Sequence, residues 1–219
     1  MLDHRLIDLQ PYGWVAPQWR QILAIVLGMV LSPEVISPIE AQTPSRTSLT
    51  GQLLVASPAM DDPRFRKTVI VVVRHDRDGA FGLVVNRPLG ERPLADLLGG
   101  SGERGTAVGR QVRIFSGGPV QPQIGFVLHG GDYRRPETVD ISAHVAMTAS
   151  REILHDIAKS TGPRQWLIAF GYSGWGPGQL EGELQRGSWS IAPGDPKLIF
   201  EEERDQVWDE AYSQRMQDL

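Results

Sequence analysis

The glycine-rich stretch from Gly171 to Leu184, GYSGWGPGQLEGEL, follows an apolar run, Trp166–Phe170, that is typical of a strand. Five glycines and one proline lie in its first twelve residues. Glycine accepts positive φ angles and lets another backbone or a ligand come close. Pro177 suits a first helical turn, and an i,i+4 leucine pair follows it. The pattern predicts a strand, a glycine-rich loop and then a helix over residues 177–186.

The segments around this stretch alternate between strand and helix patterns. Val69–Val73 is a continuous β-branched run, which fits a strand buried on both faces. Residues 148–160 carry an apolar stripe at helical spacing and end at a Gly-Pro pair. The predicted strands are 51–56, 67–74, 80–85, 112–115, 123–129, 188–192 and 197–200, and the predicted helices are 93–98 (one short turn), 148–160 and 201–217.

Composition limits the class of protein. The chain has 219 residues, 41% hydrophobic and 22% charged, which is a globular soluble profile with room for one domain of ordinary size. It contains no cysteine, which excludes thiol catalysis, disulfides and thiolate metal sites. The formal net charge is -4 and no basic run occurs, so the chain is a poor match to a phosphate backbone. Direct DNA binding is therefore not expected.

Residues 1–48 differ from the rest and are predicted to be an N-terminal extension. Residues 22–31 form an uncharged apolar run after Arg20, too short to span a bilayer but typical of a signal-peptide core. Cleavage after Ala41 would give a periplasmic protein, with residues 42–48 as a linker. Alternatively, the true start lies downstream and the protein is cytoplasmic, the location slightly favoured. We expect no transmembrane span in the mature domain, residues 49–219.

A serine hydrolase and a metal site are both weakly indicated. The nucleophile elbow needs Gly-x-Ser-x-Gly, and around Ser173 the second glycine is replaced by Trp175. His75, His129 and His144 are conceivable bases, but sequence alone places none of them beside Ser173. No His-x-x-x-His spacing occurs, so no metal and no cofactor is expected.

A cradle for a small anionic ligand is the better supported binding hypothesis. The expected helix start at Gly176–Gln179 offers free N–H groups, and Gly117-Gly118 gives a second glycine turn at a strand end. The alternative is that these glycines only allow close packing, with a tryptophan as a plug. One open cleft lined by Asn86, His129, Trp175 and Gln179 would favour the ligand. The full set of candidate residues is Asn86, Gly117, Gly118, His129, Tyr172, Trp175 and Gln179.

Four separated motifs resemble the AlgH/YqgE family of small bacterial proteins, over residues 49–212. They are LTGQLLVA at 49–56, GAFGLVVNRP at 79–88, GGPV at 117–120 with GFVLH at 125–129, and GYSGWGPGQL at 171–180.

The resemblance implies a single compact α/β (α+β mixed) domain whose strongly bent, partly barrel-like mixed sheet is flanked by helices. It implies no agreed biochemical activity, although members are commonly described as transcriptional regulators. We therefore expect a non-enzymatic regulatory or binding module that contacts an unknown protein or a small anionic ligand. The alternative is a hydrolase-like enzyme with its site at the loops near Gly117, His129 and Trp175.

Overall fold

The computed structural model describes residues 48–98, 109–201 and 203–216. The predicted extension over residues 1–48, with its apolar run 22–31, lies outside the described residues except for Ser48.

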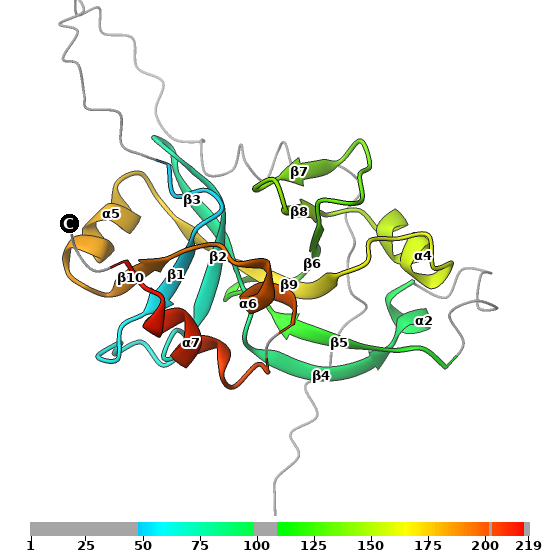
Figure 1. Ribbon diagram of the computed structural model, residues 1–219, viewed down its shortest axis with the longest axis horizontal. Coiled ribbons are helices and arrows are strands. Elements are labelled where there is room, and N and C mark those ends of the chain that lie inside the picture. Colours follow the sequence, from blue (N-terminus) through cyan, green and yellow to red (C-terminus); the bar gives the residue numbers. More distant parts are fainter. Residues whose placement is uncertain (1–47, 99–108, 202, 217–219) are drawn as a thin grey trace, which may run out of the picture.

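One bent, mixed sheet of ten strands organises the molecule, and five helices flank it in the described part of the chain (Figure 1). The main path through the sheet runs β10-β1-β2-β3-β9-β6-β8-β7, while β5 pairs with β9 and β4 pairs with β5. The strands are β1 (Leu53–Ala56), β2 (Val69–Asp76), β3 (Gly79–Val84), β4 (Pro88–Pro93), β5 (Gln111–Ser116), β6 (Val120–Gly130), β7 (Thr138–Asp140), β8 (Val145–Thr148), β9 (Trp166–Trp175) and β10 (Trp189–Ala192). The helices are α2 (Leu94–Leu97), α4 (Glu152–Ala158), α5 (Gln179–Gln185), α6 (Pro196–Phe200) and α7 (Val207–Ser213).

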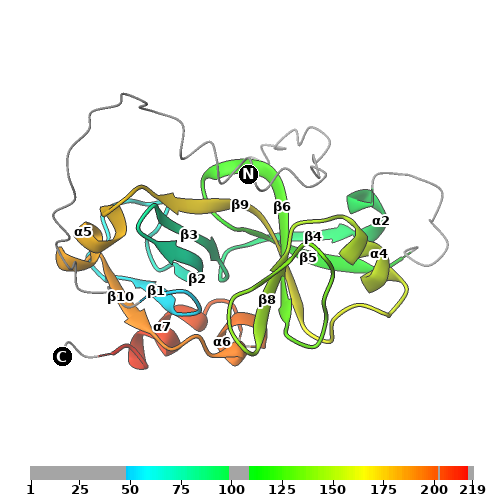
Figure 2. The same ribbon diagram turned by 90° about the horizontal axis from the view of Figure 1, so that it is seen from above.

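Strand β9 joins two halves of this sheet. Its first half pairs antiparallel with β6 and parallel with β5, whereas its last residues pair antiparallel with β3. Figures 1 and 2 show β1, β2, β3 and β10 on one side and β4 to β8 on the other, with β9 running through both. A residue of β9 therefore belongs to one half or the other according to its position along the strand.

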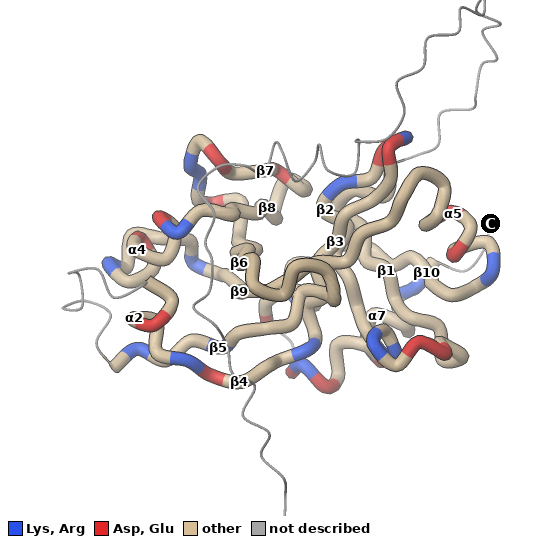
Figure 3. The backbone as a smooth tube through the Cα atoms, turned by 180° about the vertical axis from the view of Figure 1, so that it is seen from behind, with Lys and Arg blue, Asp and Glu red and all other residues tan. Residues whose placement is uncertain are grey.

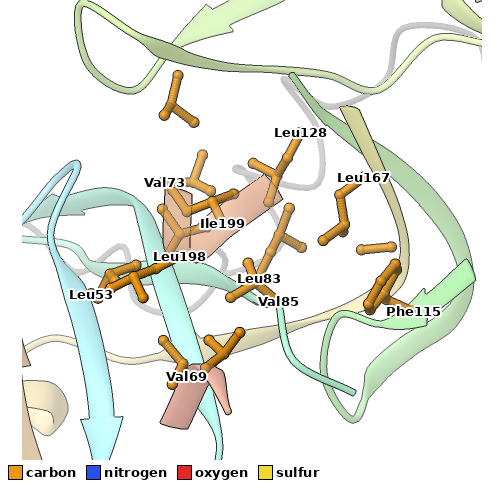
Figure 4. Close-up of a cluster of buried hydrophobic side chains, with 14 of the residues drawn as sticks. Leu53, Val69, Val73, Leu83, Val85, Phe115, Leu128, Leu167, Leu198 and Ile199 are labelled. Atoms are coloured by element: carbon orange, nitrogen blue, oxygen red, sulfur yellow. The ribbon is translucent and has the colours of Figure 1, made fainter. Parts of the chain in front are cut away.

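Three hydrophobic clusters fill the two faces of the sheet. The inner core contains alternate residues from both halves, such as Val71, Leu83, Leu128 and Leu167, and is covered by α6 and α7 (Figure 4). A second cluster lies under α2 and α4, and a third lies under α5. The run Val69–Val73 divides its side chains between the inner core and the α5 cluster, which confirms a strand buried on both faces.

The two ends of the sheet approach each other beside β1, which gives the fold its half-barrel shape. A Cβ atom added to Gly194 would lie 1.8 Å from the Gly51 carbonyl oxygen, and one added to Gly51 would lie 3.1 Å from the Ile141 carbonyl oxygen. The segment after β10 and the segment after β7 thus contact the same residue before β1. The predicted mixed α/β fold with a bent, partly barrel-like sheet is confirmed.

Four predicted elements are corrected by the structure, the first being the helix over residues 148–160, because Thr148 ends strand β8 and α4 covers only Glu152–Ala158. Residues 171–175 are not a loop, because β9 continues to Trp175, and α5 begins two residues later than predicted. Residues 197–200 form helix α6 instead of a strand, because the Asp195 carboxylate caps the helix at the Lys197 N–H and Pro196 opens it. The C-terminal helix is restricted to α7. None of the helices that the structure describes is long and apolar enough to cross a membrane.

Candidate functional site

The segment that leads into β6 passes over the second half of β9 at very close backbone contact. We call this place the glycine crossing, and it consists of Gly117, Gly118, Val120, Gln121, Gly171, Tyr172 and Ser173. A Cβ atom added to Gly117 would lie 2.3 Å from the Gly171 carbonyl oxygen, and one added to Gly118 would lie 2.2 Å from the Tyr172 carbonyl carbon. Gly118 has φ 151° and Gly171 has φ 74°, a region that favours glycine. The backbones can cross here only because no side chain separates them.

Half-buried aromatic rings lie beside the crossing. The Tyr172 ring centroid is 4.8 Å from that of Phe81 and 6.3 Å from that of Phe126. Burial raises the pKa of the Tyr172 phenol, so the ring is neutral at physiological pH. Val120, the partner of Tyr172 in the β6–β9 register, is 36% exposed. The crossing therefore presents apolar and aromatic surface that the core does not cover.

Two buried polar atoms at the crossing have no hydrogen-bond partner in the part of the chain that the structure describes. They are the Ser173 hydroxyl, whose residue is 1% exposed, and the Gln121 side-chain oxygen. Leaving such an atom unpaired costs about 1 to 3 kcal/mol. Gln121 also has φ 48°, a strained conformation for a residue with a side chain. Unpaired polar atoms and backbone strain are both more common at functional sites than in ordinary core.

Ser173 is not placed as a hydrolase nucleophile. It lies inside β9, paired with Gly82 of β3, instead of on a sharp turn between strand and helix. His129 pairs with Trp166 at the other end of β9, roughly 20 Å away at the usual rise per residue of a strand. Because the Ser173 hydroxyl has no partner among the described residues, no histidine there is positioned to activate it.

Trp175 and Gln179 meet on a glutamate that sequence reasoning did not select. The Glu183 carboxylate accepts hydrogen bonds from the Trp175 indole at 2.8 Å, from the Trp189 indole at 2.7 Å and from the Gln179 amide at 3.0 Å. The two indoles pack edge to face with their centroids 6.1 Å apart. This cluster fixes α5 to the sheet, which is the plug-like packing that the sequence left open for Trp175.

A backbone N–H group at the start of α5 is already hydrogen-bonded within the protein. The Gly176 N–H donates to the Gln179 side-chain oxygen at 3.1 Å. Glu181 and Glu183 place negative charge within the same short helix. These carboxylates repel an anion, so the electrostatics of this helix start disfavour the small anionic ligand that the sequence indicated.

His129 is 0% exposed and belongs to a chain of hydrogen bonds with one direction. Its Nδ1–H donates to the Gly130 carbonyl at 2.8 Å, so Nε2 accepts from the Thr148 hydroxyl at 2.9 Å. Thr148 then accepts from the Thr138 hydroxyl at 2.8 Å, and Thr138 accepts from the Arg135 N–H at 2.9 Å. Burial lowers the pKa of His129 and keeps it neutral. Both ring nitrogens of His129 and the hydroxyls of Thr148 and Thr138 are therefore paired.

Tyr133 closes the other side of His129. Its ring lies edge-on to the imidazole with centroids 5.4 Å apart, and its hydroxyl donates to the Asp156 carboxylate at 2.6 Å. Arg135 donates to the same carboxylate oxygen at 2.6 Å. Burial and the hydrogen bond to Asp156 raise the pKa of Tyr133 to about 12. The network ties the loop after β6 to α4 and is structural.

Asn86, just after β3, is bonded to the start of β2 at the open end of the β2–β3 hairpin. Its side-chain oxygen accepts from the Val69 N–H at 2.9 Å, and its amide donates to the Lys67 carbonyl at 2.9 Å. Trp175 pairs with Ala80 at the turn end of the same hairpin. Asn86, His129 and the Trp175–Gln179 pair therefore occupy three separate places and do not line one cleft.

The structure thus brings three of the seven predicted residues, Gly117, Gly118 and Tyr172, together at the crossing. Sequence reasoning missed Gln121 and Phe81. The only signal for Gln121 was a polar residue near the start of a strand, and the only signal for Phe81 was an aromatic residue in a glycine-containing strand. Among the described residues, no group of three or more His, Cys, Asp and Glu side chains is placed to hold a metal ion.

Comparison with known proteins gives consistent matches. The profile of the AlgH-like family matches residues 53–219. A UPF0301 protein of Methylococcus capsulatus is 46% identical over 162 residues, which are 74% of this chain and 88% of that protein. A UPF0301 protein of Rhodospirillum rubrum is 44% identical over 153 residues, which are 70% of this chain and 80% of that protein.

Two solved structures resemble the fold. The solution structure of the AlgH protein from Pseudomonas aeruginosa has a TM-score of 0.66 and 34% identity, covering 83% of this chain and 92% of that one. A crystal structure of a protein from Corynebacterium diphtheriae has a TM-score of 0.58, covering 81% of this chain and 87% of that one. Because its identity is 21%, that second likeness shows the fold alone.

Proposed function

This chain belongs to the AlgH-like family, and from that premise we propose that it is a non-enzymatic binding and regulatory module that engages its ligand or protein partner at the glycine crossing. The observation that carries the proposal is the pair of buried polar atoms without partners, on Ser173 and Gln121. Half-buried Tyr172 and Phe81 lie beside them. A hydroxyl, an amide oxygen and aromatic faces together are what a ligand site of mixed polarity needs.

The crossing favours an uncharged, flat group. None of its seven residues carries a charge, so it offers an anion no ionic partner. Tyr172 and Phe81 suit stacking against an aromatic ring or a peptide plane. The Ser173 hydroxyl and the Gln121 oxygen match the acceptor and donor of a carboxamide. We therefore expect an aromatic amide or a peptide segment in place of the small anion that the sequence suggested.

Benzamide is a probe that tests this chemistry. In 15N-labelled protein, we expect benzamide to shift the amide signals of Gly118, Val120, Gln121 and residues 171–173, and benzoate to shift them less because its charge finds no partner. Tyr172→Ala should remove the shifts. Tyr212→Ala should preserve them, because Tyr212 is a partly buried tyrosine that stacks on Trp208 of α7. Shifts that persist in Tyr172→Ala, or that appear elsewhere in the domain, would contradict the site.

Regulation in this proposal acts through a bound partner and not through direct DNA contact. A recognition helix needs several Lys or Arg residues on one face. The five described helices contain one Lys or Arg residue, Lys197, and α4 and α5 contain neither. Figure 3 shows blue and red segments interspersed around the molecule without one continuous basic face. No shift of a DNA duplex at low salt is the expected result, and a stable shift would count against this form of regulation.

The compartment is a separate part of the proposal. We place the protein in the cytoplasm, with the periplasm as the alternative if residues 22–31 act as a cleaved signal. Fractionation of the native host, followed by intact mass measurement, separates the two. A periplasmic product that begins near Gln42 would overturn the cytoplasmic assignment and point to an envelope-facing partner.

A further inference from the structure

The first described residues of the domain are held by one histidine, His75, at the end of β2. The Leu49 N–H donates to His75 Nδ1 at 3.1 Å, and the His75 N–H donates to the Thr50 hydroxyl oxygen at 3.0 Å. The Ser48 hydroxyl donates to the His75 carbonyl oxygen at 2.9 Å. Three consecutive residues, through which residues 1–47 join the domain, therefore bind the side chain and both backbone groups of His75.

The other ring nitrogen of His75 faces α5. Because Nδ1 accepts from Leu49, it carries no proton, and the N–H of the ring is at Nε2. Nε2 lies 3.4 Å from the Glu181 carboxylate. His75 is 9% exposed, so packing holds the ring between these two contacts. One imidazole thus links residues 48–50 to α5, although 131 residues separate Thr50 from Glu181 in the chain.

The position of α5 depends on few contacts. Leu180 is its one buried residue, and Glu183 connects it to the indoles of Trp175 and Trp189. With seven residues, α5 is too short to be stable by its own propensity. A change in the Glu181 contact can therefore alter how firmly the helix is held.

We infer that His75 is a two-armed latch that couples residues 48–50, where the N-terminal segment joins the domain, to helix α5. In this device the ring transmits a displacement of the leading segment to Glu181, and transmits a displacement of α5 back to Leu49. The latch does not depend on the glycine crossing, since none of its residues belongs to the crossing.

Hydrogen exchange of the full chain tests the coupling. The double variant Ser48→Ala/Thr50→Val removes the hydroxyls that grip the His75 backbone and leaves the ring and Glu181 unchanged. We expect α5 amides to exchange about two- to tenfold faster, the range that one net hydrogen bond gives. Ser57→Ala is the matched control, because the Ser57 hydroxyl that it removes accepts a hydrogen bond within a local turn, from the Ala59 N–H. Faster exchange at Leu49 with unchanged α5 would overturn the latch.

Two substitutions of His75 separate the arms and guard against general destabilisation. His75→Asn keeps an acceptor at the Nδ1 position but no donor toward Glu181, so it should accelerate exchange in α5 while Leu49 stays protected. His75→Gln keeps a donor near the Nε2 position but no acceptor for Leu49, so it should do the reverse. His144→Asn, at an exposed histidine, should change neither segment. An identical response of both segments to the two His75 variants would show that there are no separate arms.

Discussion

The two ends of β9 treat buried polar groups in opposite ways. At the Trp166 end, both ring nitrogens of His129 and the hydroxyls of Thr148 and Thr138 are paired in one chain of hydrogen bonds. At the glycine crossing, the buried Ser173 hydroxyl and the buried side-chain oxygen of Gln121 have no partner among the described residues. A buried polar group is stable when paired and costly when unpaired. The comparison teaches that the conspicuous histidine is structural, and that the unremarkable serine marks the candidate site.

The largest expected effect comes from separating the backbones at the crossing. Gly118→Ala would place a Cβ atom 2.2 Å from the Tyr172 carbonyl carbon at φ 151°. We expect it to lower the free energy of unfolding by roughly 2 to 4 kcal/mol, through overpacking and backbone strain. Urea unfolding measures the change.

Gly90→Ala is the matched control for that substitution. Gly90 also has a positive φ, 126°, but an added Cβ atom there meets nothing within 4 Å. It should therefore cost only the backbone strain. Equal losses for the two variants would mean that close contact at the crossing is not what requires glycine.

The next largest effect should come from the paired end of β9. Thr148→Val keeps the shape of the side chain but removes the hydroxyl between His129 and Thr138. His129 Nε2 is then buried without a partner, which should cost about 1 to 3 kcal/mol. The measurement is urea unfolding at neutral pH. Surface substitutions typically change the free energy of unfolding by less than about 0.5 kcal/mol. A loss that small for Thr148→Val would mean that the hydrogen-bond chain of His129 contributes little to stability.

The same histidine predicts a dependence of stability on pH. Burial lowers the pKa of His129 in the folded state below its unfolded value of about 6.5. The unfolded chain therefore binds more protons below that pH, so this contribution is fully present above about pH 6.5 and is lost as the pH falls. The urea midpoints of unfolding at about pH 7.5 and about pH 5.5 should differ more for the wild type than for His129→Gln. Equal differences would assign the acid sensitivity to other groups.

The sequence predicts the local parts of this comparison and misses the long-range parts. The β-branched run Val69–Val73 carries its own strand signal, and the structure confirms it. Asp195-Pro196 announces a helix start, and the helix that replaces the strand predicted over residues 197–200 shows that a cap outweighs a short apolar run. No local pattern placed Gly118 against Tyr172, because that contact arises from the register between β6 and β9.

The candidate site residues also divide into those with a local sequence signal and those that depend on long-range contacts. Glycine-rich motifs pointed to the crossing because close backbone contact requires glycine wherever it occurs. They did not show that Trp175 and Gln179 would be held by Glu183, since that depends on how α5 returns to the sheet. The positive φ of Gln121 likewise appears only when β6 bulges across β9.

The smallest expected effect sharpens the comparison most. Ser173→Ala removes a buried hydroxyl that has no partner, so no hydrogen bond is lost and a desolvation cost is relieved. We expect the free energy of unfolding to stay within about 0.5 kcal/mol of the wild type or to rise. Thr148→Val, which removes one buried hydroxyl from the hydrogen-bond chain of His129, serves as the comparison. If Ser173→Ala instead destabilises the domain as much as Thr148→Val does, the hydroxyl has a structural partner. The contrast between the two ends of β9 would then disappear. If stability is kept while the shifts induced by benzamide at the crossing weaken, the hydroxyl serves binding and not folding.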